Sequence, residues 1–236
     1  MYSRVVEDVD PRLSKIILVH AAVGSVLNLA ASIRARGLRR SAVLLTLGAG
    51  LPAIGELLAT GPLGLLRHRT RPRKAGVPVA IVLGWYCVIH GSFTLAERVL
   101  ARLPLEEESK SEALPPLAAL VGTSLDLVLD PAGLDAGLWE WCADGAYASE
   151  VVGTNGRRGV PLVNFLGWLA LVAGAAVVYE RGYGRERGPQ GGRLPVLLLL
   201  PYYLAAVAWA VRRRRPRYLL YSMVFPVALY AGLERG

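Results

Sequence analysis

Three carboxylates stand inside long apolar stretches of the sequence, where an ionisable side chain is costly to keep. Glu56 lies near the end of one stretch, and Asp126 and Asp130 lie four residues apart in another. A charged side chain at the centre of a membrane helix costs about 2.5 to 3.5 kcal/mol on insertion scales. Residues kept at that cost are candidates for function, as are Asn164 and His20, which also lie in apolar stretches.

The spacing of the two aspartates favours acid chemistry. Residues four apart share one face of a helix, which places Asp126 next to Asp130. Two carboxylates in a low-dielectric site cannot both ionise cheaply, so we expect at least one of them to hold a proton near neutral pH. A neutral carboxylic acid can donate that proton to a substrate.

Three tryptophans flank the acidic residues, namely Trp139, Trp141 and Trp168. An aromatic face attracts a cation by about 0.5 to 2 kcal/mol, so these rings could stabilise a developing positive charge. Composition alone also allows a simpler role, because tryptophan is enriched in the aromatic belt at the membrane–water interface.

The sequence around these side chains predicts membrane helices. The chain has 236 residues, of which 53% are hydrophobic and 19% are charged, and its mean hydropathy is +0.40. The charge is concentrated in short clusters between apolar runs of about 20 residues, the length that spans a bilayer. We therefore predict an all-α, polytopic transmembrane bundle that forms one integral membrane domain over residues 1–236, in the cell (plasma) membrane. The seven predicted spans are residues 14–32, 41–60, 76–97, 113–132, 160–180, 194–211 and 217–233.

Alternating spans bring the polar residues to one depth. His20 lies about six residues into the first span, Glu56 and Asp130 lie close to the ends of the second and fourth, and Asn164 lies near the start of the fifth. At a rise of about 1.5 Å per residue, these positions fall within roughly 10 Å of the same membrane face. Asp126 lies one turn deeper. One shared site in this half of the membrane is therefore predicted.

Simpler roles for some of these residues remain open. A carboxylate near a helix end can reach the lipid headgroups, and Asp130 precedes Pro131, which disfavours helix at the position before it. His20 and His90 could be hydrogen-bond partners between helices, because the three histidines of the chain have no metal-ligand spacing. We predict no metal site and no cofactor.

The formal net charge of +9 does not indicate a nucleic-acid partner. The arginines stand at the ends of apolar runs, where they anchor helices in the membrane, and no basic stripe with interleaved aromatic residues is present in the sequence. The expected partners are the lipid bilayer and a hydrophobic substrate.

Four segments of the sequence resemble those of a known family. They are Gly122–Pro131 with both aspartates, Gly137–Trp141, Gly159–Trp168 with its Asn-Phe-x-Gly-Trp motif, and an upstream segment that runs from Glu56 to Pro78. Together they resemble the membrane carotenoid hydratases, which include bisanhydrobacterioruberin hydratase and the bacterial carotenoid 1,2-hydratases. The sequence departs from that family after Gly64, where Leu66 and His68 stand in place of the usual tyrosines. This departure bears on the substrate more than on the type of reaction.

The resemblance implies a hydro-lyase that adds water to a terminal isoprenoid C=C bond of an acyclic carotenoid. In that reaction Asp126 or Glu56 would protonate the alkene, and Asp130 with Asn164 would hold the water. The three tryptophans and His20 would bind the substrate. Two alternatives remain: another membrane isoprenoid or carotenoid enzyme, such as a cyclase, and a non-enzymatic transporter or assembly subunit in which the carboxylates relay protons or ions.

Overall fold

The computed structural model describes residues 8–183 and 192–233, and it confirms the all-α class. Within these ranges, six helical segments are long and apolar enough to cross a membrane. They are α1 (Pro11–Arg36), the segment of α2 (Leu38–Leu45), η1 (Thr46–Gly50) and α3 (Leu51–Thr60), α4 (Val79–Leu100), α5 (Glu107–Asp135), α6 (Leu162–Tyr183), and the segment of α7 (Leu194–Leu197) and α8 (Leu200–Arg212).

The seventh predicted span, residues 217–233, is divided into two short helices, α9 (Arg217–Tyr221) and α10 (Val224–Leu233). Pro226 has no backbone N–H to give to the carbonyl of Ser222, so the helical ladder is interrupted there. Ser124 of α5 hydrogen-bonds to the backbone on both sides of this interruption. Its hydroxyl donates to the Ser222 carbonyl at 2.7 Å and accepts from the Phe225 N–H at 3.0 Å.

Helix α5 is longer than the predicted span of residues 113–132, and it continues past Pro131 to Asp135. Pro131 leaves the carbonyl of Leu127 without its helical partner. The hydroxyl of Tyr147 donates to that carbonyl at 2.6 Å. Since the freed backbone group is satisfied from outside, the helix does not end at the proline, and Asp130 stands inside α5 rather than at its terminus.

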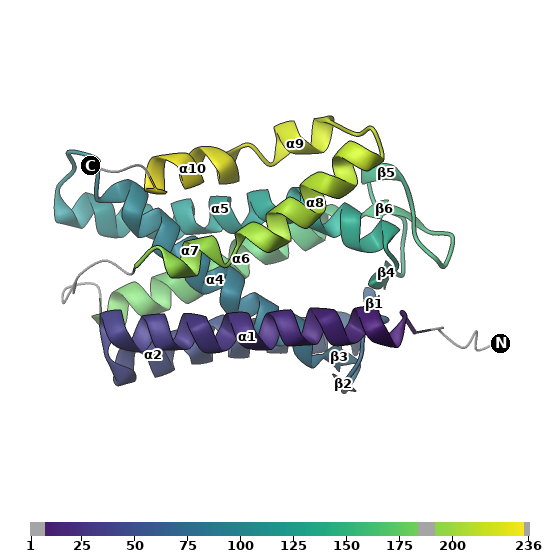
Figure 1. Ribbon diagram of the computed structural model, residues 1–236, viewed down its shortest axis with the longest axis horizontal. Helices are drawn as coiled ribbons and strands as arrows, with labels where there is room; N and C mark the ends of the chain where they lie inside the picture. Colours follow the sequence, from purple (N-terminus) through teal and green to yellow (C-terminus); the bar gives the residue numbers. More distant parts are fainter. Residues whose placement is uncertain (1–7, 184–191, 234–236) are drawn as a thin grey trace.

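Short strands form at one end of the bundle, from the segments between the predicted spans and from residues 77–78 and 160, which the sequence analysis placed at the starts of spans 76–97 and 160–180 (Figure 1). They pair as three antiparallel ladders. The pairs are β1 (Leu66–His68) with β4 (Trp139–Trp141), β2 (Arg73–Lys74) with β3 (Val77–Pro78), and β5 (Tyr147–Val152) with β6 (Arg158–Val160). In the first ladder His68 pairs with Trp139 and Leu66 pairs with Trp141, which brings two distant parts of the chain together.

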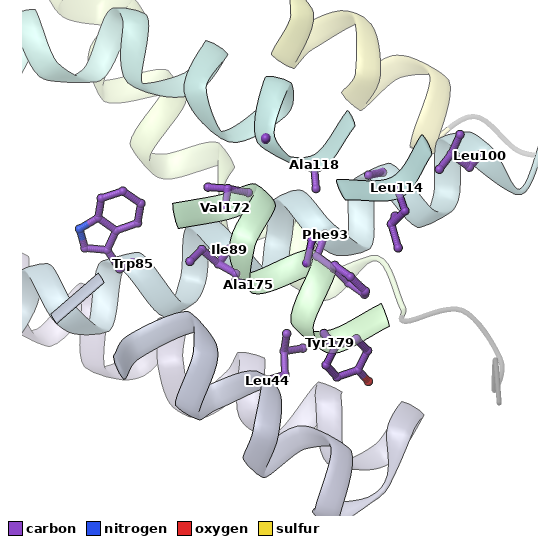
Figure 2. Packing of buried hydrophobic residues seen from close by; sticks show 13 residues of the cluster. Leu44, Trp85, Ile89, Phe93, Leu100, Leu114, Ala118, Val172, Ala175 and Tyr179 are labelled. Atoms are coloured by element: carbon purple, nitrogen blue, oxygen red, sulfur yellow. The ribbon is translucent and has the colours of Figure 1, made fainter. Parts of the chain in front are cut away.

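Helices α4 and α5 form the centre of the bundle. In the most apolar stretch of 18 residues in each of these two helices, 72% of the residues are buried. The corresponding share is 28% in α1 and α6 and 17% in the segment Leu38–Thr60. Figure 2 shows part of the core, where Ile89 and Phe93 of α4 pack among side chains of α5, α6 and α2. The outer helices expose leucine and valine side chains, which suits a lipid environment.

Candidate active site

A single cavity of about 370 Å³ is lined by every residue that the sequence analysis selected. These residues are Glu56, Asp126, Asp130, Asn164, Trp139, Trp141, Trp168 and His20. They come from α1, α3, α5, β4 and α6, which are separate segments of the sequence.

Two carboxyl groups and one amide form the centre of the polar wall. Asp126 and Asp130 of α5 are 3% and 2% exposed, and Asn164 of α6 faces both of them. The Nδ2 atom of Asn164 donates to Asp126 Oδ2 at 2.7 Å and to Asp130 Oδ2 at 2.7 Å. Trp139 Nε1 donates to Asp130 Oδ1 at 2.5 Å. Asp130 therefore accepts two N–H bonds, whereas the structure, within its described ranges, gives Asp126 only the bond from Asn164.

Glu56 of α3 is held by two side chains that the sequence analysis did not select for the site. Trp85 Nε1 of α4 donates to Glu56 Oε1 at 2.9 Å, and His68 Nε2 of β1 lies 2.8 Å from Glu56 Oε2. The ring of Trp85 also packs against that of Trp168 in a tilted arrangement, with centroids 4.0 Å apart. These contacts fix the carboxyl of Glu56 and two aromatic rings at the same wall of the cavity.

The β1–β4 ladder covers the polar end of the cavity. Trp141 is buried and Trp139 is half-buried, and both project from β4. Gly133 makes room for Trp139, because a Cβ atom at position 133 would overlap the indole ring. Gly133 lies one turn after Asp130 on α5. Because it has no side chain, the indole of Trp139 can lie against this turn and donate to Asp130.

Much of the remaining lining of the cavity is apolar. It is formed by small and aliphatic side chains of three helices, Ile16, Ile17 and Ala21 of α1, Ala80 and Ile81 of α4, and Pro201 and Ala205 of α8. His20 lies against Tyr202 with ring centroids 4.9 Å apart. A mostly apolar cavity with a small group of carboxyl side chains suits the end of a long hydrocarbon chain.

Local sequence patterns gave little indication of Trp85, His68 and Tyr202. Trp85 reads as an ordinary residue of an apolar span, and His68 stands in a basic cluster that the sequence predicted as a connection. Its place in the site depends on the pairing of β1 with β4, across about 70 residues of chain. In the described part of the chain, no group of three His, Cys, Asp or Glu side chains is arranged to hold a metal ion.

His90, the other histidine considered as a partner between helices, lies outside the cavity. Its ring is buried and stacks on Tyr86 of the same helix, with centroids 5.7 Å apart. Neither ring nitrogen has a hydrogen-bond partner among the residues that the structure describes. Among the residues that the structure describes, His90 therefore makes no hydrogen bond between helices.

The apolar helices and the acidic cavity between them define an integral membrane protein with a buried polar site. The sequence profile of the carotenoid biosynthesis protein family matches residues 15–230, a range that contains every residue of the site described above. The chain belongs to this family. Comparisons with curated proteins and with solved structures found no match.

Proposed function

We propose that this protein is a hydratase of the cell membrane that adds water to a terminal isoprenoid C=C bond of an acyclic carotenoid. The observation that carries the proposal is the presence of three carboxyl groups and four tryptophans in the lining of one cavity that is otherwise mostly apolar. Membership of the carotenoid biosynthesis family supports the class of substrate.

Hydrogen bonding distinguishes the roles of the three carboxyl groups. N–H donors stabilise the ionised form of a carboxyl group. Asp130 accepts bonds from Trp139 and Asn164, and Glu56 contacts Trp85 and His68. Asp126 receives one bond, from Asn164. We assign Asp126 as the proton donor on this basis, with Glu56 as the second candidate that the sequence analysis named.

The reaction proceeds in two steps. Asp126 gives its proton to the less substituted alkene carbon, which leaves a tertiary carbocation at the other carbon. The indole faces of Trp85 and Trp168 lie at the same wall as Glu56 and stabilise that charge. A water molecule, held by Asp130, then forms the new C–O bond and gives a proton to Asp130.

Asn164 joins the two aspartates, so it positions the acid and the base together. Return of the proton from Asp130 to its neighbour Asp126 resets the site. The sum of the steps is the addition of one water molecule, without an oxidant, a reductant or a nucleotide.

Expression in cells that accumulate lycopene or bisanhydrobacterioruberin tests the proposal, with the pigments analysed by mass spectrometry. We expect a gain of one or two waters, which Asp126→Asn abolishes. Glu108→Gln is the matched control, since Glu108 is exposed at the other end of the same helix. A product of unchanged mass but altered chromatography would indicate a cyclase instead, and unchanged pigment with both substrates would refute the hydratase.

A further inference from the structure

Polar residues occupy one face of the second half of α1, after the residues of this helix that line the cavity. Ser25, Asn28, Ser32 and Arg36 follow one another at intervals of three or four residues, which places them on the same side of the helix. Ser25, Asn28 and Ser32 are buried, and Asn28 is 0% exposed. This face therefore points into the protein rather than into lipid.

Helix α4 presents a matching face to it. Cys87, His90, Thr94 and Glu97 repeat the same intervals on α4, and the two helices run in the same direction and pack together. The first and last pairs of these residues are in contact across the two helices. Ser25 Oγ lies 3.6 Å from Cys87 Sγ, and Arg36 donates to Glu97 at 2.9 Å and 2.5 Å. We call these two facing rows the polar ladder.

The middle of the polar ladder is unsatisfied. His90 is 1% exposed, and Thr94 and Ser32 are as deeply buried. Several polar atoms in this part of the polar ladder have no hydrogen-bond partner among the described residues. These atoms are both ring nitrogens of His90, the side-chain nitrogen and oxygen of Asn28, and the hydroxyls of Ser32 and Thr94. Buried polar groups in native proteins almost always have partners, and where side chains do not supply them, ordered water does.

The polar ladder connects two distinct places in the molecule. At one end, Ser25 and Cys87 lie about one helical turn beyond Ala21 and Gly84, which line the cavity. The buried hydroxyl of Tyr202, which also lines the cavity, has no hydrogen-bond partner among the described residues. At the other end the Arg36–Glu97 ion pair stands where α1 and α4 finish, away from the strands that cover the site (Figure 1). The residues from Ser25 to Arg36 span about 16 Å of helix. This length covers roughly half of a hydrocarbon core of about 30 Å.

We propose that the polar ladder binds a file of water molecules that runs from the Arg36–Glu97 pair to the cavity at Tyr202. Water both donates and accepts, so it can bridge the hydroxyls, the amide and the imidazole of the two helices at once. The file also has a use, because hydration consumes one water molecule for each alkene. That use rests on the proposed function, whereas the binding of water does not.

X-ray hydroxyl-radical footprinting of the intact protein in lipid nanodiscs tests the binding of water directly, because radicals form from water at the site and oxidise the nearest side chains. After correction for intrinsic reactivity, we expect His90 to be oxidised about tenfold faster than Phe225, which is equally buried in an apolar cluster. Equal protection of the two residues would mean that the polar ladder is dry, and would overturn the inference.

The continuity of the file is tested by Asn28→Leu, which replaces the amide by an apolar group of similar size. We expect oxidation of His90 to fall about threefold, because a water loses two of its partners. Val26→Leu, on the lipid-facing side of α1, is the matched control and should change nothing. Wild-type oxidation of His90 in Asn28→Leu would contradict a continuous file.

The use of the file is tested separately by pigment conversion. Asn28→Leu should slow hydration about fivefold if the file supplies the water, and an unchanged rate would refute the supply role. If the wild-type protein forms no hydrated pigment, the proposed function fails, while footprinting of His90 still decides whether water is bound.

Discussion

Asn164 holds two carboxyl groups with one amide nitrogen, and Asn164→Leu preserves its size while removing both hydrogen bonds. A hydrogen bond to a charged group contributes about 1.5 to 3 kcal/mol. In the proposed mechanism, Asp126 becomes ionised as it gives its proton to the alkene, and the bond from Asn164 stabilises that developing charge in the transition state. Since about 1.4 kcal/mol corresponds to a factor of ten in rate, we expect hydration to slow by roughly 10- to 150-fold.

The assay is the initial rate of pigment hydration in membranes, divided by the amount of folded protein measured by size-exclusion chromatography in detergent. Val163→Leu is the control, because Val163 precedes Asn164 on α6 and faces outward with 52% exposure. A rate for Asn164→Leu within threefold of wild type, in a folded protein, would refute the role of the amide in linking acid and base.

Three further substitutions test the supports of the site. Tyr147→Phe leaves the Leu127 carbonyl unsatisfied and should destabilise the protein by about 1 to 3 kcal/mol; an unchanged thermal midpoint in detergent would contradict this. Gly133→Ala should displace the Trp139 ring and lower hydration at least tenfold, to be checked by initial rates, and wild-type activity would show that the indole need not sit there. Trp168→Ala removes one cation-stabilising face worth about 0.5 to 2 kcal/mol, so its hydration rate should fall by roughly 2- to 30-fold, and an unchanged rate would remove Trp168 from the site.

The candidate site was predictable from sequence because depth in a membrane follows from counting residues. Glu56, Asp130 and Asn164 are far apart in the chain, but each lies a few residues from a span end on the same face. Alternating helices then leave little freedom in their vertical positions. Lateral positions do not follow from such a count, so the grouping of these residues around one cavity required the structure.

The contacts that orient Glu56 could not be predicted in the same way. His68 reaches it only because β1 pairs with β4, and Trp85 reaches it across the packing of α3 against α4. Both depend on interactions between distant segments, for which local periodicity carries no information.

Two prolines illustrate why helix ends were the weakest part of the prediction. Pro131 and Pro226 each remove one helical N–H. At Pro131 the freed carbonyl accepts a hydrogen bond from the hydroxyl of Tyr147, and the helix continues. At Pro226 the hydroxyl of Ser124 bonds to the backbone on both sides of an open turn, and the helix divides. The outcome is decided by a side chain elsewhere in the sequence, so the proline alone predicts neither result.

Conversion of an acyclic carotenoid by the purified protein in water labelled with heavy oxygen shows whether the protein adds water to the pigment. We expect a tertiary alcohol that carries one heavy oxygen for each hydrated end, formed without added cofactor and lost in Asp126→Asn. A product without the label, or equal labelling by Asp126→Asn, would contradict acid-catalysed hydration at this site.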